Sequence, residues 1–198
     1  MGFFDQLMNK AQSALNTAAN DAGKAVTRAA SAKTEKIVLS GIPTSAAEMQ
    51  AAPEFSLQNP YAVAAFCIAA LCVYPQNKEA TAEMLNVLRG PNPLSPHDIQ
   101  FLRDRFMDGK DYKPRSYFDG ATPENDYKPA EPYTLTIKEQ SNSRDQENMI
   151  TLYMTSGGAD NARPITLRHK PSTNEWFLWE YSSILMDIRI PKSADAWA

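Results

Sequence analysis

Histidine and cysteine are scarce in this chain, with two of each among 198 residues. His97 and His169 lie in separate segments, and neither has a cysteine near it in the sequence. Spacings that are typical of metal ligands, such as C-x-x-C or H-x-x-x-H, do not occur. The sequence therefore predicts no metal site.

The two cysteines, Cys67 and Cys72, fall inside one apolar run at residues 61–74. Five helical positions correspond to about 500°, which places the two side chains roughly 140° apart and prevents a disulfide between them. An apolar setting also raises the pKa of a thiol, which disfavours a role as nucleophile. Reduced thiols, and an N-terminus (MGFFDQLMNK) without the pattern of a signal peptide, predict a cytoplasmic location.

Excess positive charge and long apolar runs are lacking too. The formal net charge is -3 and the pI is about 5.4, so nucleic acid is not an expected partner. The longest apolar run, residues 61–74, has fourteen residues, which is too short to span a bilayer.

Motifs of catalytic and cofactor sites are missing as well. There is no G-x-S-x-G, and no G-K-[ST] follows the pair Gly157-Gly158, which we interpret as a hairpin turn. Carboxylates of residues 98–111 alternate with arginines at helical spacing, which is typical of a solvated helix face. We expect no catalytic residue and no cofactor, and we favour a protein that is not an enzyme, with a triad assembled from distant segments left open.

Residues 1–35 are expected to form an amphipathic helix that is an appendage to the domain. Small and apolar residues recur every three or four positions from Phe4 to Ala29. Its richest part is a face formed by Phe3, Phe4, Leu7 and Met8. This face could bind a membrane surface through residues 3–15, but Lys10 is the only basic residue before Lys24. Packing on its own domain, or self-association, is favoured over the membrane or a partner's groove.

Residues 36–198 are interpreted as a single domain that begins with helices between 45 and 109. Ser45, Asn59 and Ser95 each stand where a helix N-cap is expected, and proline follows directly after two of them. The helix over 61–74 is apolar nearly all round, so it should lie at the centre of the core. In the last helix the core-facing stripe is expected at Ile99, Leu102 and Phe106.

Residues 110–132 contain four prolines and an unusual number of aromatic side chains. We predict an ordered segment that wraps the domain, because a long loop with several tyrosines is not typical of a disordered linker. From residue 133 to 190 the apolar period changes to two, with glycine- or proline-rich turns between the runs. The sequence thus predicts an α+β fold, with the helical half packed on a C-terminal antiparallel sheet of about four strands, and a further short strand is possible at KIVLS, residues 36–40.

The last predicted strand, EWFLWEY, has apolar side chains on both faces. It is either a platform for a ligand or a strand covered on both sides, with Trp176 on one face and Trp179 on the other. We favour the covered strand, with residues 110–132 and the tail that ends at Trp197 as the second cover. The candidate ligand or interaction patch combines nearby cations with these rings: Arg163, Arg168, His169, Trp176 and Trp179. For these cations we favour the alternative, which is simple packing over aromatic rings at the rim of the sheet.

Several long motifs resemble an uncharacterised family of bacterial proteins that is defined only as a domain of unknown function. They are GPNPLSPHDIQFLRDR, FDGATPENDYKP, SGGADNARPITLR, WFLWEYSSILMDIRIP and DAWA. The resemblance covers roughly residues 36–198. It implies a bacterial source and brings no catalytic residue, cofactor or substrate with it.

Three functions remain. The favoured one is a non-catalytic cytoplasmic binding or interaction module, whose partner is an unknown protein or a second copy bound through the N-terminal helix. The second is a small-molecule pocket protein or enzyme with an aromatic-lined cavity. The third is a peripheral membrane protein.

Overall fold

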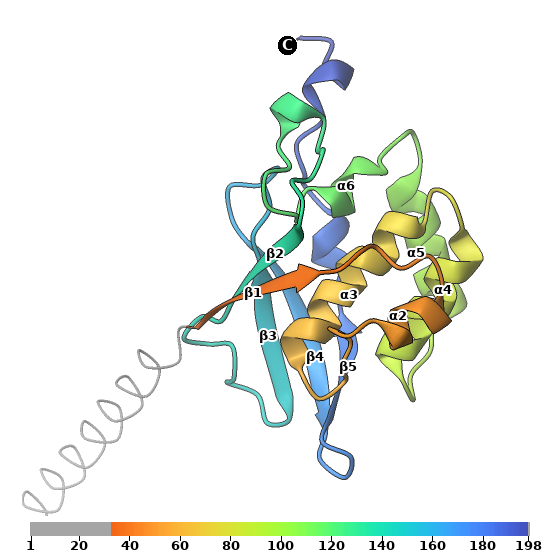
Figure 1. Ribbon diagram of the computed structural model, residues 1–198, viewed down its shortest axis with the longest axis vertical. Coiled ribbons are helices and arrows are strands. Elements are labelled where there is room, and N and C mark those ends of the chain that lie inside the picture. The colour runs from red at the N-terminus through yellow and green to blue at the C-terminus, as the bar shows by residue number, and fades with distance from the viewer. Residues whose placement is uncertain (1–32, 198) are drawn as a thin grey trace, which may run out of the picture.

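The computed structural model describes residues 33–197, and these residues form a helical layer packed on one face of an antiparallel sheet (Figure 1). The predicted α+β fold is confirmed. No helix in this range is long and apolar enough to cross a membrane.

Within the described range the sheet has five strands in the order β1-β2-β3-β4-β5, and every neighbouring pair is antiparallel. Their bounds are β1 (Thr34–Leu39), β2 (Tyr133–Lys138), β3 (Met149–Met154), β4 (Arg163–Lys170) and β5 (Glu175–Glu180). β1 is the strand that KIVLS suggested, and it pairs with β2 in the register Leu39↔Tyr133. The helices therefore sit in the connection between two neighbouring strands (Figure 1).

Alternation along the strands separates the two faces of the sheet. The face under the helices carries side chains that are fully buried: Leu135, Ile137, Ile150, Leu152, Ile165 and Leu167. The opposite face carries half-buried threonines such as Thr136, Thr151 and Thr166, and no described helix lies over it (Figure 1).

The helical layer contains α2 (Ala46–Ala51), α3 (Pro60–Val73), α4 (Lys78–Arg89) and α5 (Pro96–Phe106). Three of these helices, α2, α3 and α5, begin at the predicted caps. The side chains of Ser45, Asn59 and Ser95 each accept a hydrogen bond from a backbone N–H of the first turn. α3 is buried along nearly its whole length, which confirms its central place.

The expected core stripe of α5 is only partly right. Leu102 is buried, but Ile99 is 53% exposed. α5 lies at the periphery of the helical layer (Figure 1), and Leu102 is its only buried residue, so the residue one turn earlier is left in solvent.

The aromatic side chains of residues 110–132 are buried, as predicted for a wrapping segment. This segment contains the short helices α6 (Tyr112–Arg115) and η1 (Pro123–Asn125). Tyr117 Oη donates to the carbonyl of Ile184 at 2.8 Å, and Tyr127 Oη donates to the carbonyl of Arg189 at 2.6 Å. The tyrosines thus tie the segment to the chain that follows β5, which includes η2 (Ser182–Leu185).

Candidate functional site

The strand β5 is not covered on both sides, and that interpretation is wrong. Trp179 is 42% exposed, and Trp197 in the tail is 96% exposed, so the tail does not cover β5. The tyrosines of residues 110–132 anchor that segment to residues 184–189, beyond the end of β5, and not to its outer face. The ligand-platform alternative therefore regains support.

A close contact brings the end of α4 against β5. Gly90 closes α4 with φ +55°, and a Cβ at this position would overlap the ring of Phe177. Only glycine combines this backbone conformation with so close an approach. The turn after α4 is thereby held beside the β4–β5 hairpin.

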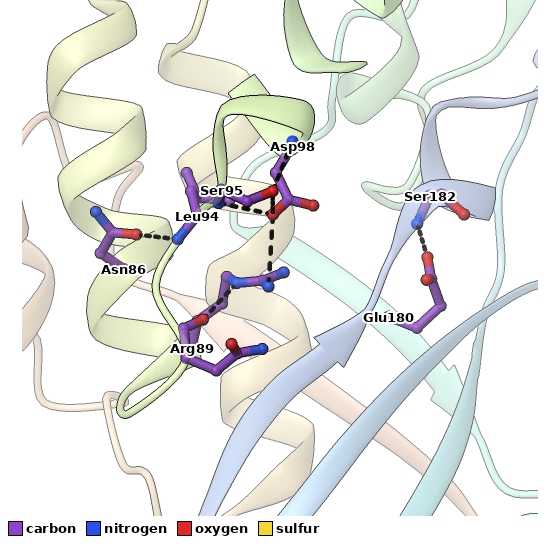
Figure 2. Close-up of polar contacts among 8 residues, drawn as sticks. Asn86, Arg89, Leu94, Ser95, Asp98, Glu180 and Ser182 are labelled. Atoms are coloured by element: carbon purple, nitrogen blue, oxygen red, sulfur yellow. Dashed lines mark hydrogen bonds and ion pairs between the residues drawn. The ribbon is translucent and has the colours of Figure 1, made fainter. Parts of the chain in front are cut away.

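Polar contacts fix the shape of that turn (Figure 2). Asn86 Oδ1 accepts from the backbone N–H of Leu94 at 2.8 Å, and Arg89 Nε donates to the carbonyl of Asn92 at 2.8 Å. Arg89 Nη2 lies 3.7 Å from the Asp98 carboxylate, which links α4 to the first turn of α5. The side chain of Arg89 is only 8% exposed, so its guanidinium is held in one orientation.

A pocket of about 410 Å³ lies between this turn and the β4–β5 hairpin. The described residues that line it are Arg89, Pro91, Asn92, Arg168, His169, Lys170, Pro171, Phe177, Leu178 and Trp179. Three of them are lysine or arginine and two are phenylalanine or tryptophan, and the lining set contains no carboxylate. We call this site the β5 pocket.

Arg168 is an exposed cation of the β5 pocket. Its Cζ lies over the ring of Trp179, 4.9 Å from the centroid. Within residues 33–197 no carboxylate forms an ion pair with it. Glu180, at the end of β5, accepts from the backbone N–H of Ser182 at 2.6 Å (Figure 2). A guanidinium on an exposed indole, without an acidic partner, is suited to receive an anion.

Asp98 holds the second guanidinium of the β5 pocket. Burial raises the pKa of the Asp98 carboxyl, but hydrogen bonds from Ser95 and the charge of Arg89 outweigh it and leave the pKa below its usual value. Ser95 donates to Asp98 through its backbone N–H at 2.8 Å and through its hydroxyl at 2.7 Å. Asp98 therefore stays ionised and keeps Arg89 in place.

A comparison with protein families finds a match that covers most of the chain. Residues 41–192 match the domain of unknown function DUF6935. The chain belongs to this family. No curated protein and no solved structure matches it. The family resemblance expected from the motifs is confirmed, and membership of DUF6935 assigns no role to any residue.

The five residues of the predicted patch do not all meet. Arg168, His169 and Trp179 line the β5 pocket. Trp176 pairs with His169 across the hairpin and stacks on its ring at 4.6 Å, packed against the core. Arg163 lies at the opposite end of β4, where its Nη2 donates to the carbonyl of Asp187 at 2.8 Å.

Sequence reasoning missed the part of the β5 pocket that comes from the α4–α5 turn. Arg89, Asn92 and Phe177 were not proposed as site residues, because helical and strand periodicity does not show which turn lies beside which hairpin.

The Glu139 carboxylate and the two cysteine thiols are the other side chains that could act in catalysis. The carboxylate is already hydrogen-bonded, and burial keeps the thiols protonated. Glu139 accepts from Tyr61 Oη and from Arg144 Nε and Nη2, the last two at 2.9 and 2.8 Å. Burial raises the pKa of Glu139, but these hydrogen bonds outweigh it and lower the pKa overall. Burial also raises the pKa of both thiols, that of Cys72 to about 12, and the two cysteines are not bonded to each other.

In the part of the chain that the structure describes, no three His, Cys, Asp or Glu side chains gather in a way that could hold a metal ion. The predicted membrane or self-association face, Phe3, Phe4, Leu7 and Met8, lies outside the described residues.

Proposed function

We propose that the protein is a non-catalytic binding module, and that its β5 pocket holds an acidic group attached to a flat apolar body. The observation that carries the proposal is Arg168 lying over the exposed ring of Trp179 without an acidic partner among the described residues. The guanidinium would receive the acid, while the rings of Trp179 and Phe177 would contact the apolar body.

The other cations of the β5 pocket support this ligand class. Lys170 and the buried Arg89 lie on the same pocket, and His169 completes the basic lining. A chain with a net charge of -3 has no general excess of cations, so their concentration here favours an anion. The cytoplasmic location expected from the sequence remains part of this proposal.

A binding role is favoured over catalysis because the carboxylates of Glu139 and Asp98 are already engaged in hydrogen bonds and ion pairs. The Glu139 carboxylate is occupied by Tyr61 and Arg144, and Asp98 by Ser95 and Arg89. General acid–base work needs a group whose proton is available to the substrate. The groups on the β5 pocket are better placed to hold a ligand.

Anilinonaphthalene sulfonate tests the proposal, because it combines an anionic group with flat apolar rings and its fluorescence reports binding. We expect the native protein to bind this dye, and Arg168→Glu and Trp179→Ala each to weaken binding about tenfold. Lys138→Glu makes the same charge change on another strand of the sheet and should leave binding unchanged.

Circular dichroism and urea unfolding should show that each variant remains folded. Equal dye affinity in all three variants and the parent would place the binding site elsewhere and overturn the proposal.

A further inference from the structure

Trp197 is the most exposed large apolar side chain among the described residues, at 96%. Its backbone N–H donates to Asp195 Oδ1 at 2.9 Å, so a carboxylate is fixed two residues before the ring. The segment 195–197 thus presents an acid beside a flat apolar body. These are the two features that the β5 pocket is suited to bind.

We propose that the partner of the β5 pocket is the segment Asp195–Trp197 of a second copy of this chain. The inference rests on the proposed function of the β5 pocket and adds the identity of its occupant. In the complex, the Asp195 carboxylate would pair with Arg168, and the Trp197 indole would pack on Trp179 and Phe177.

Charge and ring chemistry are complementary between the two surfaces. The pocket lining contains Arg89, Arg168 and Lys170, and the described residues that line it include no acid. The pocket volume of about 410 Å³ is ample for one indole ring and a neighbouring carboxylate. Burial of an indole that is otherwise in water would supply the main driving force.

The geometry favours a second copy over the same chain. The C-terminal end lies at one end of the molecule, and the turn between β4 and β5 lies at the other (Figure 1). The tail is also tied down near its start, because Asp126 Oδ1 accepts from the backbone N–H of Ser193 at 3.2 Å. A tail held in this way cannot reach the β5 pocket of its own chain unless the contact between Ser193 and Asp126 breaks.

A contact between a tail and a pocket joins two different surfaces, so it can repeat from copy to copy. The full chain should then form assemblies whose mean mass rises with concentration. A symmetric pairing through one shared surface would instead stop at a dimer.

Two complementary variants test the contact in the full chain. Arg168→Glu damages the β5 pocket and keeps the tail, and Trp197→Ala removes the ring of the tail and keeps the pocket. In sedimentation equilibrium each variant alone should associate about tenfold more weakly than the parent. An equimolar mixture should regain association, because it offers one intact pocket and one intact tail, but only as far as pairs.

Any association through residues 1–35 would appear equally in the parent, the variants and the mixture, and it serves as the common baseline. The Lys138→Glu variant should form assemblies of the same mean mass as the parent. The inference would be overturned if both single variants associated as strongly as the parent. It would also be overturned if the mixture failed to regain association. If dye binding at the β5 pocket persists in that case, the proposed function stands and only the identity of the partner is wrong.

Discussion

At the scale of single residues, Gly90 determines how closely the end of α4 approaches β5. Its backbone has φ +55°, and the space that a Cβ would need is filled by the Phe177 ring. The wall of the β5 pocket therefore depends on the absence of one methyl group.

We expect Gly90→Ala to lower the free energy of unfolding by about 3 kcal/mol, because steric overlap with Phe177 adds to backbone strain. The variant should also weaken dye binding, since the ring of Phe177 must move. Urea unfolding and a dye titration measure the two effects.

Two other glycines serve as controls. Gly109 has φ +70° but an open Cβ position, so Gly109→Ala should cost only the strain, about 1 kcal/mol. Gly41 has open space and no positive φ, so Gly41→Ala should be close to neutral. If Gly90→Ala lowers the free energy of unfolding no more than Gly109→Ala does, the contact with Phe177 does not constrain the turn.

The Glu139 carboxylate is a second residue with a clear physical role. Its side chain is only 4% exposed, and it accepts hydrogen bonds from Tyr61 and Arg144. A buried carboxylate with such donors stabilises the fold while it is ionised.

We expect Glu139→Gln to lower the free energy of unfolding by about 2 kcal/mol near neutral pH. The folded-state pKa of Glu139 lies below its ordinary value of 4.5. Its contribution is therefore fully present above 4.5 and is lost as the pH falls through the lower folded-state value. The difference between the two proteins should shrink over that acidic range.

Urea unfolding at several pH values measures this difference. Glu147→Gln, at an exposed position in the loop between β2 and β3, removes the same charge and should show no such trend. A difference between Glu139→Gln and the parent that stays constant with pH would mean that the carboxylate charge is not the source of the stabilisation.

At the scale of elements, the start of α5 connects helix capping to the β5 pocket. Ser95 accepts from the backbone N–H of Asp98 and also donates to the Asp98 carboxylate. That carboxylate faces Arg89, which lines the pocket. A single cap therefore supports both the helix and the orientation of a pocket cation.

We expect Ser95→Ala to lower the free energy of unfolding by about 1 kcal/mol, which is usual for loss of an N-cap. It should also weaken dye binding, because Asp98 and Arg89 lose their fixed positions. Ser45→Ala removes the equivalent cap of α2, away from the β5 pocket, and should lower stability without a change in dye binding. Equal dye binding by both variants would contradict the link between Asp98 and the pocket.

The starts of α2, α3 and α5 were predictable because capping depends on a few adjacent residues. Asn59 before Pro60 and Ser95 before Pro96 marked two starts correctly. The exposure of Ile99 and of Trp179 was not predictable in this way. Periodicity shows which side chains share a face, but not whether another element lies over that face.

At the scale of the whole molecule, the helices lie on one face of the sheet, and the α4–α5 turn reaches the hairpin at its edge (Figure 1). The C-terminal tail lies at the opposite end (Figure 1). A binding site and its proposed occupant at opposite ends of one molecule are suited to contacts between copies. This arrangement could not be inferred from either segment alone.

The amino-acid sequence by itself determined the local features of this DUF6935 protein. Caps, prolines and the change of period at residue 133 set the helices, the wrapping segment and the strands, because each depends on neighbouring residues. Only the tertiary structure decided that Arg89 and Arg168 share a pocket, that Arg163 is apart from it, and that Trp179 remains exposed. These outcomes depend on how distant elements pack, and in particular on the close approach of Gly90 to Phe177.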